Sequence, residues 1–88
     1  MFKVGAKVIG DWGPLHSPSY GKISEINIDN FDSPLPTMSC IIDWAEGGQS
    51  QQKLVSIHWD NVGSAGIGIY FAGGDEPDEW FEKEGELI

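Results

Sequence analysis

The chain opens with Phe2-Lys3-Val4-Gly5-Ala6-Lys7-Val8-Ile9 and continues after a loop with Gly21-Lys22-Ile23-Ser24-Glu25-Ile26, and these two stretches decide its fold. In the first stretch apolar side chains fall at alternate positions, which predicts a half-buried β-strand. Residues 10–19, between the two stretches, are rich in Gly, Pro and Ser and predict a loop. The apolar positions that follow predict a strand with a bulge or a sharp bend, and they are Tyr20, Ile23, Ile26 and Ile28.

Two further strands are predicted in the middle of the chain. Apolar residues alternate with other residues over 37–44, and residues 46–51 have the composition of a turn. A second alternation starts at Lys53, and its apolar members are Val55, Ile57 and Trp59. The two strands are expected to form a hairpin in which Trp44 and Trp59 both occupy core positions.

The last third of the chain changes character. Residues 66–71 predict a short, glycine-rich strand. From Asp75 to Gly85, a Pro near the first turn, acidic residues at the start and a Gly past the end predict about two turns of helix, partly of the 3₁₀ type. Residues 86–88 are expected to pair as a final edge strand. The pattern therefore predicts one all-β domain over residues 1–88, a small barrel or open β-roll of five to six short strands with one short helix near the C-terminus.

Short motifs along the chain carry a family resemblance. They are Val4-Gly5 with Val8-Ile9, Gly21-x-Ile23-x-x-Ile26, and Val55-x-Ile57-x-Trp59-Asp60. With these motifs the chain resembles SH3-like barrels of the KOW, Tudor and Mind-bomb kind. It is similar to small uncharacterised barrels of phages and bacteria, and to SH3-like subunits that dock on redox and photosynthetic complexes. The resemblance implies an SH3-like barrel that serves as a binding module. It does not extend to residues 66–84, and the basic residues with which KOW domains approach RNA are absent.

The charge balance narrows the range of partners. Fourteen acidic residues stand against five Lys and no Arg, which gives a formal net charge of −9. Binding to nucleic acid normally needs a basic stripe and the planar fork of Arg for phosphates and guanine edges. We therefore expect no nucleic acid and no membrane as a partner, and a protein instead.

The single cysteine and the first residues of the chain indicate the cellular compartment of the protein. Cys40 is the one cysteine of the chain, so an internal disulfide cannot form and a reducing compartment fits. No run approaches the ~20 apolar residues of a membrane span, and the first residues lack the basic start and apolar stretch of a signal peptide. A cytoplasmic location is expected. Edge strands of such a sheet can pair two copies of the chain, so a monomer and an edge-strand homodimer both stay open.

No constellation of residues points to catalysis. Cys40 falls on an apolar alternating face and is expected to be buried. His16 lies in the first loop and His58 on the polar face of a strand, without the spacing of zinc ligands. Ser56, His58 and Asp60 alternate on one predicted strand about 7 Å apart, which is too far for the hydrogen bonds of a triad. We therefore expect no catalytic residue, no metal and no cofactor.

Aromatic side chains give the clearest binding signal. Trp12 lies in the first loop and Tyr20 begins the next strand. The resemblance implies that this loop and the neighbouring strands form the groove for partners, where exposed aromatic residues anchor a ligand. The predicted partner-binding residues are Trp12, Tyr20 and His16. Trp80 and Phe81 are expected to close the open end of the barrel.

Three functions follow as hypotheses. The leading one is a non-enzymatic binding module that docks on another protein through Trp12 and Tyr20. Seven of the fourteen acids lie within residues 75–88, which favours as the alternative an acidic mimic of nucleic acid that inhibits a basic protein. The third is an accessory subunit of a larger complex. An enzyme would require a deep pocket lined by His16, His58 or Cys40.

Overall fold

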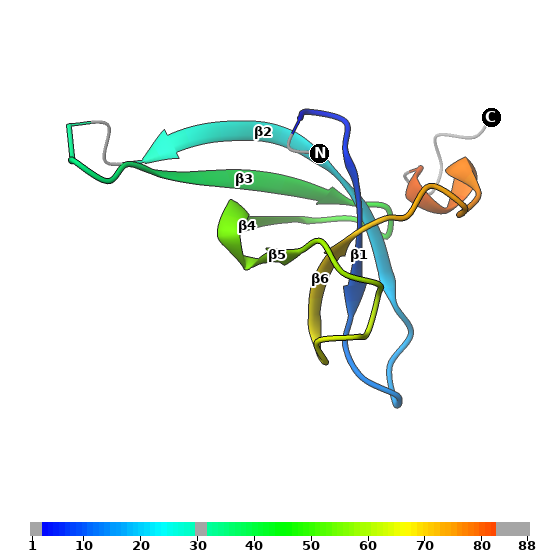
Figure 1. Cartoon of the computed structure of the whole chain (residues 1–88). Coiled ribbons are helices and arrows are strands. Elements are labelled where there is room, and N and C mark those ends of the chain that lie inside the picture. The colour runs from blue at the N-terminus through cyan, green and yellow to red at the C-terminus, as the bar shows by residue number, and fades with distance from the viewer. Residues whose placement is uncertain (1–2, 30–31, 83–88) are drawn as a thin grey trace.

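The computed structural model describes residues 3–29 and 32–82 and consists mainly of β-strands (Figure 1). In chain order its elements are β1 (Lys7–Asp11), β2 (Ser19–Asp29), β3 (Thr37–Trp44), β4 (Gln49–Lys53), the 3₁₀ helix η1 (Leu54–Ser56), β5 (Ile57–His58), β6 (Gly68–Phe71) and the 3₁₀ helix η2 (Asp78–Phe81). The strands form one sheet in the order β4-β3-β2-β1-β6-β5, which curls into a half-barrel. The predicted fold class, a small all-β barrel-like domain, is confirmed.

The long strand β2 gives the sheet its curvature. Residues 19–22 of β2 pair with β1, and residues 21–29 pair with β3. Between Ile23 and Glu25 the register with β3 shifts by a bulge, as the spacing of apolar residues predicted. A bulge bends a strand and increases its twist, so β2 can serve both halves of the curled sheet. Beyond β4, β2 and β3 continue as a two-stranded ribbon that extends from the body of the molecule (Figure 1).

The first strand is shorter than predicted. The prediction began it at Phe2, which lies outside the described residues, whereas β1 begins at Lys7. Gly5 has a φ of 93°, a left-handed conformation that favours glycine and cannot continue a strand. The Gly5 N–H instead donates to the carbonyl of Ile23 at 2.7 Å, which fastens the N-terminal turn to β2.

Of the two strands predicted for the central hairpin, the first is confirmed and the second lies elsewhere in the chain. Strand β3 has the bounds that the sequence predicted. Its partner β4 ends at Lys53, where the predicted strand was expected to begin. The chain turns through η1 instead, because this turn places the side chain of Leu54 in the core while Val55 stays 91% exposed. Strand β5 then pairs in parallel with β6, not with β3.

The core lies on the inner face of the curled sheet. Its fully buried side chains include Ile23, Ile42, Val8 and Cys40. Tyr70 is fully buried as well but lies outside this cluster, and its hydroxyl donates to the carbonyl of Gly66 at 2.5 Å. The buried position expected for Cys40 is confirmed, and burial raises the pKa of its thiol above the ordinary value. Trp44 is buried as predicted, whereas Trp59 is 59% exposed and the prediction of a core position is wrong. Ile57 is in the core, but β5 ends at His58, so the alternation does not continue to Trp59.

Within residues 75–82, the described part of the predicted helix, the chain forms one 3₁₀ turn, η2. Its buried residue is Phe81, whose ring meets that of Tyr20 on β2 edge to face, with centroids 5.4 Å apart. Two ion pairs add to this contact: Lys7 with Asp78, and Lys22 with Glu82 at 3.1 Å. The edge strand predicted over residues 86–88 lies outside the described residues. Within the described ranges no helix is long and apolar enough to cross a membrane.

Candidate functional site

A groove of about 290 Å³ lies between the start of β2, the turn after β3 and η2, and we call it the Tyr20 groove. The residues that matter for its chemistry are Pro18, Tyr20, Glu46, Glu79, Trp80 and Glu82. They come from three separate parts of the chain, which the pairing of β2 with β3 and the docking of η2 bring together. The groove thus combines aromatic rings and carboxylates.

Two rings form its aromatic wall. The centroids of Tyr20 and Trp80 are 5.1 Å apart, with an angle of 46° between the ring planes. Trp80 remains 46% exposed although Phe81, the next residue, is buried. The buried Phe81 anchors η2 on β2 and holds the indole of Trp80 beside Tyr20. The result is an exposed, rigidly backed aromatic surface of the kind that anchors protein partners.

A chain of hydrogen bonds orders one carboxylate of the groove. The indole Nε1–H of Trp12 donates to the hydroxyl of Ser19 at 2.8 Å, and that hydroxyl donates to Oε1 of Glu46 at 2.6 Å. Trp12 itself is half-buried and packs edge to face on Trp44, with ring centroids 6.1 Å apart. Trp12 therefore lies behind the groove and positions Glu46, whereas Tyr20 is part of the groove wall.

The third predicted residue, His16, does not line the Tyr20 groove. It is exposed in the loop between β1 and β2, where its backbone N–H donates to the carbonyl of Gly13 at 3.2 Å. The structure thus brings Trp12 and Tyr20 together through Ser19 and leaves His16 apart from them.

The charge of the groove is negative. Glu46, Glu79 and Glu82 line it, and no lysine does. Glu82 is paired with Lys22, and Glu46 accepts the hydrogen bond of Ser19, which leaves its negative charge uncompensated. In the described part of the chain the carboxylate of Glu79 has no cationic partner within ion-pair distance. The net potential of the groove therefore favours a cation.

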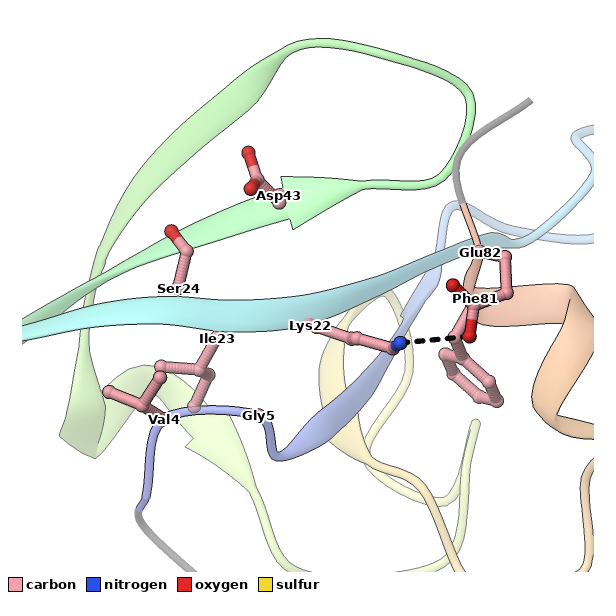
Figure 2. A pocket seen from close by; sticks show the side chains of 8 residues that line it. All are labelled: Val4, Gly5, Lys22, Ile23, Ser24, Asp43, Phe81 and Glu82. Carbon is pink, nitrogen blue, oxygen red and sulfur yellow. Dashed lines mark hydrogen bonds and ion pairs between the residues drawn. The ribbon is translucent and has the colours of Figure 1, made fainter. Parts of the chain in front are cut away.

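A neighbouring cavity of about 380 Å³ has polar groups that the chain itself satisfies (Figure 2). Lys22 pairs with Glu82 across its mouth, and the hydroxyl of Ser24 donates to the carbonyl of Ile41. The carboxylate of Asp43 accepts from the amide of Gln49 at 2.8 Å. The polar groups of this cavity have partners, whereas Glu79 in the Tyr20 groove has no cationic partner among the described residues, so we place the candidate site at the Tyr20 groove.

The residues considered for catalysis lie apart from both cavities. Cys40 is buried and its pKa is raised, so its thiol is protonated at neutral pH. His58 is half-buried and its ring lies 4.8 Å from that of Tyr70. Ser56 belongs to η1 and not to the strand of His58. The described ranges contain no group of three or more His, Cys, Asp or Glu side chains that could hold a metal ion.

Sequence reasoning missed Glu46, Glu79 and Trp80 as members of the site. The signal for Glu79 and Trp80 was present in the acidic, aromatic segment 75–82, but its position on β2 depends on contacts between distant parts of the chain. Glu46 lies in a predicted turn, and nothing local connects it to Trp12.

Comparison of the chain with protein-family models, with curated proteins and with solved structures gives no match.

Proposed function

We propose that this protein is a non-enzymatic binding module whose Tyr20 groove takes a basic segment of another protein. The observation that carries the proposal is the position of the Tyr20 and Trp80 rings, 5.1 Å apart, beside the carboxylates of Glu46 and Glu79. The proposed module type is an SH3-like barrel, supported by the way β1 joins β2 on one side and β6 on the other to curl the sheet.

The chemistry of the groove favours a lysine or arginine side chain. An ammonium or guanidinium group is attracted to the face of an aromatic ring, and the attraction is strongest for Trp. Carboxylates beside the ring accept the N–H groups of the same cation in charge-assisted hydrogen bonds. Trp80 supplies the exposed ring and Glu79 the nearby carboxylate.

The charge of the whole chain supports the same partner. A net charge of −9 accelerates encounter with a basic protein and repels acidic ones, including a second copy of this chain. The cytoplasm is the location we propose, because the single buried thiol of Cys40 needs no oxidising compartment.

The acidic mimic of nucleic acid receives less support. Such a mimic depends on acids presented freely to a basic partner, and two acids of the segment 75–82 pair with Lys7 and Lys22 of the same chain. An accessory subunit of a larger complex is compatible with the proposal, since its docking surface would be the same groove.

The proposal is tested with a labelled peptide of alternating lysine and alanine, whose binding is followed by fluorescence anisotropy. We expect saturable binding to the intact chain that weakens as salt is added. Trp80→Ala is expected to weaken binding by about tenfold, and Glu79→Gln by about two- to fivefold.

The matched control is Glu25→Gln, which removes the same charge from an exposed position of β2 outside the groove. It should leave the dissociation constant unchanged. Equal losses for Glu25→Gln and Glu79→Gln would show that only net charge matters and would contradict the assignment of the groove, as would an absence of binding.

A further inference from the structure

A second aromatic surface lies outside the Tyr20 groove. Trp59 follows β5, and its ring lies against that of Phe71 on β6, with centroids 4.5 Å apart and an angle of 33° between the planes. Despite this contact Trp59 remains 59% exposed, whereas Phe71 is almost buried. Phe71 thus supports the indole from one side, while Trp59 as a residue keeps more than half of its surface exposed.

The surface is part of a depression of about 390 Å³, which we call the Trp59 pocket. The lining residues that matter are Trp59, Asp60, Val62, Phe71, Asp75 and Glu76. Three of them carry carboxylates and none carries a positive charge. The pocket lies within the ~300–1,000 Å³ range of small-ligand sites.

One carboxylate of the pocket is held in place. Oε2 of Glu76 accepts the backbone N–H of Gly74 at 3.0 Å, and Gly74 has a φ of 97°, which fixes the turn after β6. Glu76 is therefore ordered before any ligand arrives. Preorganised groups lower the entropic cost of binding.

We propose that the Trp59 pocket binds the guanidinium group of an arginine side chain from another protein. A guanidinium is flat, so it stacks on the exposed indole of Trp59, and its fork of N–H donors matches a carboxylate such as that of Glu76. A neutral or acidic partner is disfavoured by the three carboxylates on the rim. Lysine fits less well because an ammonium presents no flat face to the ring.

This inference is independent of the Tyr20 groove, since the two sites share no lining residue. They do share the C-terminal segment, which contributes Asp75 and Glu76 to one site and Glu79 and Trp80 to the other. On this proposal the acidic residues of the segment 75–82 serve two separate cation sites, the Trp59 pocket and the Tyr20 groove.

The probes for the test are N-acetyl-arginine amide, its neutral isostere N-acetyl-citrulline amide, and N-acetyl-lysine amide. Each is titrated into the intact, ¹⁵N-labelled chain while the indole N–H resonance of Trp59 is followed. The arginine amide is expected to give a saturable shift, the lysine amide a weaker one and the citrulline amide none. Equal shifts with all three would overturn the inference.

Three variants locate the effect. Glu76→Gln keeps an oxygen that accepts from Gly74 N–H but removes the charge, and it should weaken binding of the arginine amide by about two- to fivefold. Asp32→Asn removes one charge from an exposed position that does not line the pocket, and should leave binding unchanged. If Asp32→Asn weakens binding as much as Glu76→Gln, net charge alone accounts for the shift and the pocket assignment is wrong. Trp59→Ala, followed through the backbone amide of Val62, should abolish the saturable shift.

Discussion

The ring of Tyr20 lies 5.1 Å from the ring of Trp80, centroid to centroid, although one begins β2 and the other belongs to the last described turn. This contact brings the acidic C-terminal segment onto the sheet. The two exposed tryptophans, Trp59 and Trp80, each line a surface that carries carboxylates.

Replacing Phe81 or Trp80, two neighbouring residues of η2, with Ala should affect different properties: the first stability, the second binding. Phe81 is 3% exposed, so Phe81→Ala is expected to lower the free energy of unfolding by about 3 kcal/mol. Trp80 is 46% exposed, and Trp80→Ala should cost about 1 kcal/mol or less while it weakens binding of a basic peptide. Urea denaturation of both variants measures the difference. A larger loss of stability for Trp80→Ala than for Phe81→Ala would show that the anchoring role is assigned to the wrong residue.

The Ser19 hydroxyl should matter for both stability and binding. Ser19→Ala leaves the half-buried indole N–H of Trp12 without its acceptor and releases the carboxylate of Glu46. The expected loss of stability is about 1–2 kcal/mol, because a donor that loses its partner inside the protein keeps its desolvation cost. Affinity for the lysine–alanine peptide should fall as well.

Ser24→Ala is the control for this variant, since the hydroxyl of Ser24 is exposed and donates to the backbone carbonyl of Ile41. Its stability and affinity should stay close to those of the unaltered chain. Equal effects of the two serine substitutions would argue against a special role of the Trp12–Ser19–Glu46 chain.

Acidification should loosen the C-terminal turn. The hydrogen bond and charge of Lys7 hold the pKa of Asp78 below its ordinary value. A lowered pKa in the folded state means that this contribution to stability is present above the ordinary pKa and is lost as pH falls through the folded value. The fluorescence of Trp80 should therefore change below about pH 4.

Asp78→Asn is the matched variant because it removes the titrating group and keeps the size of the side chain. It should lack the part of the fluorescence change that belongs to this ion pair. If both chains give the same acid transition, Lys7 and Asp78 do not control the position of η2.

The sequence predicted those elements whose signals are local. The alternation over 37–44 corresponds to β3 without any shift of its bounds, and the irregular spacing around Ser24 corresponds to the bulge in β2. Both features follow from the period of two residues that places side chains on alternate faces of a strand.

The errors occur where one backbone turn interrupts such a pattern. The left-handed φ of Gly5 delays the start of the first strand to Lys7, and β5 ends at His58, before the alternation reaches Trp59. The sequence predicted part of the candidate site, namely Tyr20. It did not predict the contact of Tyr20 with Trp80 or the hydrogen bond from Ser19 to Glu46, because both join distant segments of the chain. Pairings of this kind depend on the folded sheet, so a single sequence does not specify them.

The indole N–H resonances of the four tryptophans offer the most direct test of a cation-binding Tyr20 groove. During titration with the lysine–alanine peptide, the signal of Trp80 should shift most, and that of Trp12 should shift less, through the hydrogen bonds to Ser19 and Glu46. Trp44, whose indole donates to Ser50 at 2.8 Å inside the sheet, should not move. Shifts of Trp80 and Trp12 that saturate together are the predicted result. A titration in which Trp80 stays still while the peptide binds would contradict the proposed function.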